Sequence, residues 1–281
     1  MFEALRDTLS QTNQALVNTK YNISFFEYIG YPLLAPNWPT VLVWFTFFFF
    51  IHILSGLTQP FFIKKRAYEI TRRLRINWQT HVISQLHAIV ISYLCITAMI
   101  TTPITDRIAD TDPQILRLAN YSLGFFLYDL YICYIDFEYQ GLSFTAHALV
   151  AFNSLLFCYM PRIMYYVPVI LMFEFSTIFL NNIWFCDKLG LAGSQLQIAN
   201  SIGLLISFAV VRVFYGSYKF YELAVTIISN WNSFSNFLIY TIFPSIIILW
   251  SLNLFWFYKI TRAFFKKFAE LKSAKSSQKS D

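Results

Sequence analysis

The chain has 281 residues, of which 57% are hydrophobic, 20% aromatic and only 13% charged. Soluble domains carry about 25% charged residues, so this chain has too little charge to cover a water-exposed surface. Its 31 Phe, 18 Tyr and 7 Trp exclude a disordered protein, and four cysteines are too few for a disulfide scaffold. The composition therefore indicates a polytopic membrane protein.

Apolar stretches close to the ~20 residues that a membrane-spanning helix needs recur along the chain. The expected spans are 39–57, 81–101, 121–135, 142–160, 163–185, 196–215 and 234–258. The third is the shortest and contains Asp129, which leaves five or six spans as the alternative. The predicted fold is an all-α membrane bundle of about seven helices. Its expected segments are an N-terminal segment (1–38), a first helix (39–62), the main domain (63–265) and a disordered basic tail (266–281).

Positive charge gathers in two places, which predicts the orientation of the chain. Residues 64–75 and residues 259–281 each have a net charge of +5, against +6 for the whole chain. Six expected crossings separate them, so both lie on one side, and basic flanks favour the cytoplasm. The N-terminus is then luminal, where Asn22 begins an Asn-Ile-Ser glycosylation sequon. We expect an integral protein of the endoplasmic reticulum or Golgi, whose basic residues meet lipid headgroups rather than nucleic acid.

Polar side chains inside several spans recur at helical spacing. An ionisable side chain at the centre of a bilayer costs about 2.5–3.5 kcal/mol, so these residues are expected to face the bundle interior. The aligned sets are His81 with Gln85, Ser122 with Asp129, Ser143 with His147 and Ser154, Glu174 with Thr177 and Asn181, and Ser201 with Arg212. Five such sets predict a polar interior that is the candidate site.

Each set also has a purely structural interpretation. Ser, Thr and Asn in spans commonly hydrogen-bond a neighbouring helix. Arg212 could form a buried pair with Asp129 or Glu174 that only orients helices, and His147 could be either a packed core histidine or a reactive one. No pattern of metal ligands occurs, so no metal and no resident cofactor are expected.

The same residues carry a resemblance to a known family. The run LGFFLYD at 123–129, His147 in the next span, FEFSTIFLN at 173–181 and then Arg212 resemble the TLC domain, over about residues 72–263. This family includes ceramide synthases and translocation-associated membrane proteins. The patterns Gly-x-x-x-Tyr-Asp and Glu-x-Ser-Thr-x-x-x-Asn are most similar to the orphan members linked to lipid homeostasis.

The resemblance implies a membrane protein that binds or handles an acyl chain, a sphingolipid or a phospholipid in a central cavity. The alternative is an acyl-CoA-dependent N-acyltransferase of the ceramide-synthase type, with acyl-CoA as co-substrate. Its catalytic residues would be His147 and Asp129, with Asp129 orienting the imidazole. In either case Glu174, Ser176, Asn181, Arg212, His81 and Gln85 would contact the substrate. Ceramide synthases have two adjacent histidines where this chain has Ala146 and His147, which favours the non-catalytic function.

Overall fold

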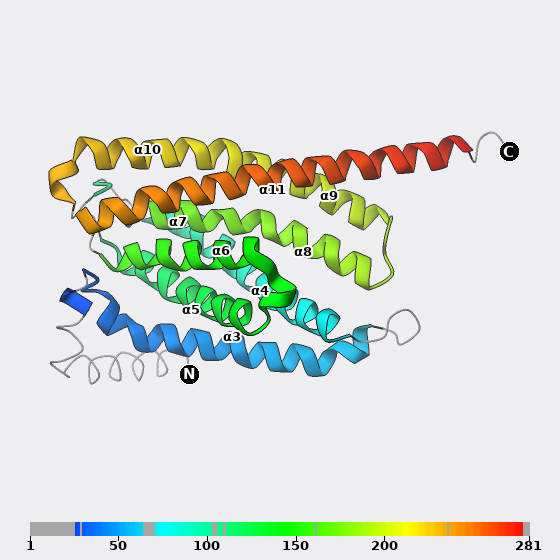
Figure 1. The fold of residues 1–281 in the computed structure, drawn as a ribbon, viewed down its shortest axis with the longest axis horizontal. Helices are drawn as coiled ribbons and strands as arrows, with labels where there is room; N and C mark the ends of the chain where they lie inside the picture. Colours follow the sequence, from blue (N-terminus) through cyan, green and yellow to red (C-terminus); the bar gives the residue numbers. More distant parts are fainter. Residues whose placement is uncertain are drawn as a thin grey trace.

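The computed structural model describes residues 26–28, 30–63, 71–102, 106–108, 111–160, 162–234 and 236–277. These ranges contain helices and turns and no β-strand. The expected luminal sequon at Asn22 lies outside them. Figure 1 shows the long helices running side by side along one axis, as a membrane bundle requires.

The helices follow one another up and down the bundle. They are α3 (Leu34–Phe62), α4 (Arg72–Thr101), α5 (Pro113–Ile135), α6 (Phe137–Leu156), α7 (Tyr166–Leu171), α8 (Phe175–Lys188), α9 (Gln195–Ser207), α10 (Gly216–Ser229) and α11 (Asn236–Ser277). A 3₁₀ turn η2 (Met172–Glu174) joins α7 to α8, and a π-helical segment η3 (Phe208–Tyr215) joins α9 to α10. A second 3₁₀ turn, η1 (Phe157–Tyr159), continues α6.

Six of these segments are long and apolar enough to cross a membrane. They are Leu34–Phe62, Arg72–Thr101, Phe137–Tyr159, Tyr166–Lys188, Gln195–Ser229 and Asn236–Lys267. The remaining expected span, 121–135, lies in α5, which runs alongside the others (Figure 1) but is not among these six. Thirteen of its 23 residues are buried, so α5 meets protein rather than lipid over most of its surface. The chain is thus an all-α polytopic membrane bundle.

Both basic segments adjoin the same end of the bundle. We call this end, where α3 ends, α4 begins and α11 leaves the bundle, the tail end (Figure 1). The opposite end, where α4 ends and α5 and α7 begin, is the far end. At the tail end the Arg72 guanidinium is 2.7 Å from the carboxylate of Asp136, between α5 and α6.

The tail differs from its prediction. Residues 266–281 were expected to be disordered, but α11 continues as a helix to Ser277, and only 278–281 lie outside the description. Ser, Lys and Ala recur in this stretch, and Lys and Ala are good helix formers, so a helix already begun in the membrane can propagate through them.

Local sequence explains where several helices begin. Asp112 caps α5, since its carboxylate accepts hydrogen bonds from the backbone N–H groups of Gln114 (2.6 Å) and Ile115 (3.3 Å). Pro113 follows at the first helical position, where a missing N–H costs nothing. Thr71 and Ser194 cap α4 and α9 in the same way. These caps separate the membrane-spanning runs into distinct helices.

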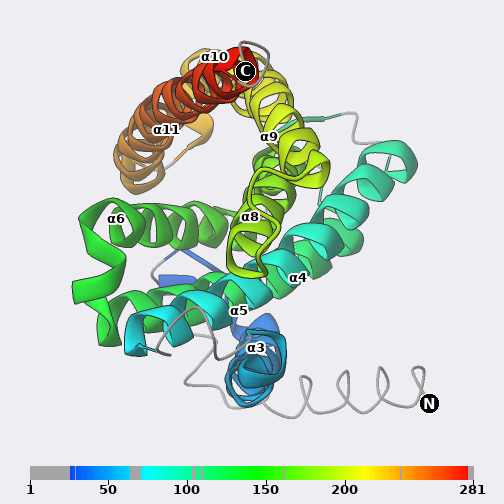
Figure 2. The ribbon, with the colours of Figure 1, turned by 90° about the vertical axis from the view of Figure 1, so that its right-hand side faces the viewer.

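The main hydrophobic core lies among α3, α4, α5 and α7. Gly124 of α5 permits the closest approach, because a Cβ atom there would be 2.5 Å from the Cβ of Trp44 on α3. Viewed along the bundle axis (Figure 2), α3, α4 and α5 lie on one side, α9, α10 and α11 lie on the other, and α8 lies between them. The polar residues of the candidate site come from helices around this centre.

Candidate functional site

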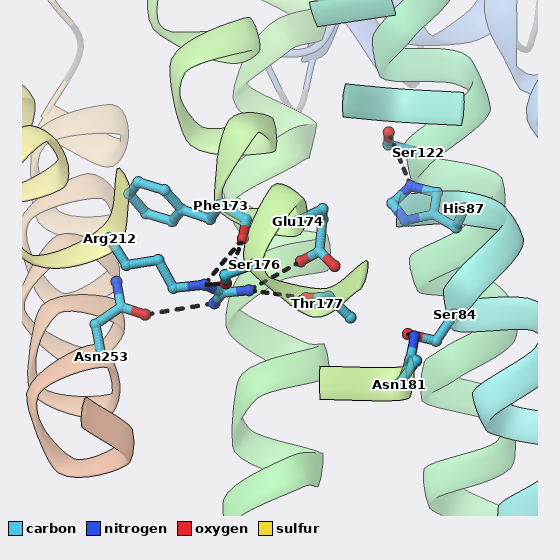
Figure 3. Close-up of polar contacts among 10 residues, drawn as sticks. All are labelled: Ser84, His87, Ser122, Phe173, Glu174, Ser176, Thr177, Asn181, Arg212 and Asn253. Carbon is cyan, nitrogen blue, oxygen red and sulfur yellow. Dashed lines mark hydrogen bonds and ion pairs between the residues drawn. The ribbon is translucent and has the colours of Figure 1, made fainter. Parts of the chain in front are cut away.

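The centre of the bundle contains a buried arginine whose guanidinium contacts several acceptors. Arg212 is only 5% exposed and crosses from η3 to η2 and α8 (Figure 3). Its Nε donates to the backbone oxygen of Phe173 and to the Ser176 hydroxyl, both at 2.9 Å. Its Nη2 donates to the Thr177 hydroxyl at 3.1 Å, and its Nη1 donates to Asn253 Oδ1 at 3.4 Å. We call these five residues the Arg212 cluster.

Glu174 supplies the counter-charge for this arginine. The Glu174 carboxylate is 3.7 Å from Arg212 Nη2, and the residue is 7% exposed. A buried arginine is tolerated in a membrane bundle when it is paired and hydrogen-bonded in this way. The sequence left Asp129 and Glu174 as alternative partners, and the structure pairs Arg212 with Glu174.

The π-helical segment positions Arg212. The N–H of Gly216 reaches the carbonyl of Val211, five residues earlier, which is the π-helical pattern. Gly216 itself packs on Phe173, since a Cβ there would be 2.9 Å from the Phe173 ring. The expectation that Ser201 shares a face with Arg212 assumed a regular α-helix, and the wider turn of η3 breaks that phase. The Ser201 hydroxyl instead donates to the Gln197 carbonyl of its own helix.

Asn181, His81 and Gln85 form a separate network between α4, α8 and α9. His81 Nδ1 donates to Asn181 Oδ1 at 2.7 Å, and Asn181 Nδ2 donates to the Ser84 hydroxyl at 3.2 Å. Gln85 donates to Asn182 at 3.2 Å, and Asn182 donates to Asn200 at 3.0 Å. These residues bridge helices, which is the structural role expected for amides in spans. We call them the α8 network; it lies apart from the Arg212 cluster.

His147 and Asp129 are partly buried, and no side-chain hydrogen bond of either is found among the described residues. The Nδ1 atom of His147 is buried and has no hydrogen bond within the described residues. The imidazole packs edge-on against Trp256 at a centroid distance of 5.1 Å. No hydrogen bond joins His147 to Asp129 in the described chain, so Asp129 does not orient the imidazole in this conformation.

An apolar pocket opens beyond His147 in the direction of the far end. It lies between α6, α7, α10 and α11, is partly open at the surface, and has a cavity volume of about 40 Å³. The three lining residues with hydroxyl groups are Ser154, Tyr166 and Ser245. A small packed cluster that includes Val150, Phe173 and Phe220 lies between the pocket and the Arg212 cluster. Among the described residues, no group of three His, Cys, Asp or Glu side chains could hold a metal ion.

Sequence reasoning missed Asn253 as a member of the Arg212 cluster. It is a lone amide within the apolar run of the last span, and it is 3% exposed. A polar residue in a membrane span is the signal that could have found it. Lys219 and Glu222 of α10, which lie near the far end, were not predicted either.

The fold and this buried interior define a helical integral membrane protein with a polar centre. The TLC domain family model matches residues 77–262, which is about two thirds of the chain. The chain therefore belongs to the TLC domain family, as the motif at 173–181 predicted.

Several curated proteins are similar over much of their length. An uncharacterized TLC domain-containing protein of Schizosaccharomyces pombe is 30% identical over 242 residues, covering 85% of this chain and 82% of the relative. Topoisomerase I damage affected protein 4 of Saccharomyces cerevisiae is 26% identical, covering 60% and 64% respectively. TLC domain-containing protein 4-B of Danio rerio is 25% identical, covering 72% and 80%. No solved structure matches the chain.

Proposed function

We propose that this protein binds the acyl chain of a membrane lipid in the pocket between α6, α7, α10 and α11, and acts in membrane lipid homeostasis. The observation that carries the proposal is the pocket itself, a partly open apolar hollow between four helices of a membrane bundle, along which an acyl chain from the bilayer can lie. An acyl chain is the apolar ligand that the surrounding bilayer supplies in excess. Membership of the TLC domain family is compatible with such a role.

Shape, rather than hydrophobicity, must select the ligand. Lipid tails are as apolar as the pocket walls, so moving a chain from bilayer to pocket gains little from the hydrophobic effect. Selectivity then depends on close packing along the chain and on polar contacts at its headgroup. The three hydroxyls of the pocket and the charged residues beside it are the groups that can provide such contacts.

One observation supports acyl transfer from acyl-CoA as a second function. The unpartnered imidazole of His147 faces the same interior and could accept a proton or an acyl group. Lipid binding is better supported, because a general base is normally oriented by a hydrogen bond to its second nitrogen and His147 lacks one here.

The experiment compares two tryptophan substitutions on α11. Leu249 lines the pocket and is 6% exposed, whereas Ile247 is 60% exposed on the outer surface. We expect Leu249→Trp to reduce the lipid that co-purifies with the protein about tenfold, because the indole fills the space, while Ile247→Trp retains it. The lipid is extracted and measured by mass spectrometry. Equal amounts in both variants would contradict the proposal, and an acyl group attached to His147 would favour the transferase.

We further propose that the protein resides in the endoplasmic reticulum or Golgi, with the tail end of the bundle in the cytoplasm. The support is that Arg72, Arg73 and Arg75 begin α4 at the same end from which the basic last part of α11 projects. Basic residues next to membrane spans favour the cytoplasmic side.

A further inference from the structure

A compact group of charged and aromatic side chains lies at the far end, outside the sites described above. The Lys219 ammonium donates to the Glu222 carboxylate at 3.1 Å and to the Tyr165 hydroxyl at 2.8 Å. The Arg107 guanidinium is 2.9 Å from the same carboxylate. We call Arg107, Tyr165, Lys219 and Glu222 the far-end cluster.

The far-end cluster contains two cations for one carboxylate. Lys219 and Glu222 are buried, whereas Arg107 is half-exposed. The neighbouring Asp106 carboxylate accepts a hydrogen bond from the backbone N–H of Ile108 at 2.8 Å. The Lys219 ammonium also lies 4.9 Å from the centre of the Tyr165 ring. Asp106 adds a second carboxylate beside Arg107, so an anionic ligand group would be held by a charge-assisted hydrogen bond from the exposed part of the guanidinium rather than by a surplus of positive charge.

The far-end cluster adjoins the apolar pocket, and Tyr166 contacts both. The ring of Tyr166 lines the pocket, while its hydroxyl is 3.0 Å from that of Thr226 and 3.5 Å from the carboxylate of Glu222. Ile163, another lining residue, donates its backbone N–H to the carbonyl of Ile108 at 3.0 Å. The segment that carries Arg107 is therefore attached to the pocket wall. Charge and apolar space together form an amphipathic site.

We propose that this site binds an amphiphile that has one acyl chain in the pocket and an anionic headgroup, a phosphate or a carboxylate, against Arg107. The inference rests on the proposed function and adds the class of headgroup and the direction of the ligand. The Arg212 cluster is a poorer anion site, because its guanidinium already contacts four protein acceptors and the Glu174 carboxylate.

The test measures binding of two probes to the full chain in phosphatidylcholine nanodiscs. Lysophosphatidic acid carries the anionic headgroup, and a monoacylglycerol with the same chain is its neutral match. We expect Arg107→Gln to weaken lysophosphatidic acid binding roughly tenfold, the loss of one charge-assisted hydrogen bond, and to leave monoacylglycerol binding unchanged. Glu222 keeps Lys219 as its partner in this variant, so the fold is preserved.

The matched control is Arg162→Gln, since Arg162 is an exposed far-end arginine that lies over the Phe234 ring. We expect it to bind both probes as the unmodified chain does. If Arg107→Gln leaves the preference for the anionic probe intact, or if Arg162→Gln abolishes it equally, the headgroup assignment is overturned. A fatty acid with the same chain is a third probe, because its headgroup is a carboxylate rather than a phosphate. If Arg107→Gln weakens the binding of both anionic probes, the site accepts either anion; if it weakens the binding of only one, that anion is the headgroup. Failure of Leu249→Trp to weaken either lipid would instead overturn the proposed function.

Discussion

The two sides of the bundle centre differ in how their polar side chains are used. On the α8 side, Asn181 and Asn182 hydrogen-bond to α4, and Asn182 also bonds to α9. On the α6 side, Asn153 donates to Ser245 of α11 at 3.2 Å, while the buried Nδ1 of His147 has no described partner. The apolar pocket opens on this second side.

This difference teaches where a ligand can enter a membrane protein. Interhelical hydrogen bonds hold helices together, because lipid offers no alternative partners for polar groups. An interface that has few of them and contains unfilled space can exchange a chain with the bilayer while breaking few such bonds. We therefore assign a structural role to the α8 network and a binding role to the α6–α11 side. Substitutions on the two sides should therefore differ in how much they change stability and lipid binding.

The largest effect on stability is expected from removing the charge of Arg212, which lies between the two sides of the bundle centre. Arg212→Gln leaves the Glu174 carboxylate buried without its cation, and breaking a buried pair in this way costs about 3–5 kcal/mol. Thermal unfolding of the purified protein in detergent should show a clear fall in stability. The double variant Glu174→Gln with Arg212→Gln should recover part of the loss. An unchanged unfolding temperature for the single variant would show that the pair contributes nothing.

A smaller loss is expected in the α8 network. Asn181→Leu removes the hydrogen bonds with His81 and Ser84, and interhelical bonds of this kind contribute about 0.6 kcal/mol each. We expect the free energy of unfolding to fall by about 1 kcal/mol, without loss of co-purifying lipid. Leu180→Met, at the neighbouring exposed position, is the control. A loss of lipid with unchanged stability would assign Asn181 to binding instead.

The smallest effect on stability is expected at His147. Replacing an unsatisfied buried polar group by an apolar one of similar shape is nearly neutral or stabilising, so His147→Leu should change the free energy of unfolding by less than about 1 kcal/mol. The same unfolding assay measures this. A much larger loss would mean that the imidazole has a structural partner and would remove the contrast between the two sides.

Hydropathy and charge were sufficient to predict most of the fold. Six spans, the helical class and the placement of both basic segments next to one end follow from long apolar runs and their flanks. The third span was the difficult one, because α5 is buried by other helices and does not need a lipid-compatible surface. Residues such as Asn120 and Ser122 can then be buried among its apolar neighbours.

The candidate site was predicted in part. The spacing of Glu174 and Thr177 correctly placed both on the face that meets Arg212, and the motif at 173–181 added Ser176. Asn181, seven residues after Glu174, hydrogen-bonds to α4 instead. The far-end cluster could not be predicted, since only the fold brings Arg107 to Lys219 and Glu222. Contacts between residues that are far apart in the chain leave no periodic pattern in the sequence.

The π-helical segment Phe208–Tyr215 has a consequence for how this span tolerates change. Compared with a regular α-helix, this segment contains one extra residue within a continuous helix. The extra residue lies where the Arg212 side chain extends toward η2. The wider turn absorbs this residue, so deleting one residue after Arg212 would return the helix to regular turns with α10 nearly unrotated relative to α9. The same deletion in a regular helix would rotate everything that follows by about 100°. This stretch is therefore the part of the span where the far end best tolerates the loss of a single codon.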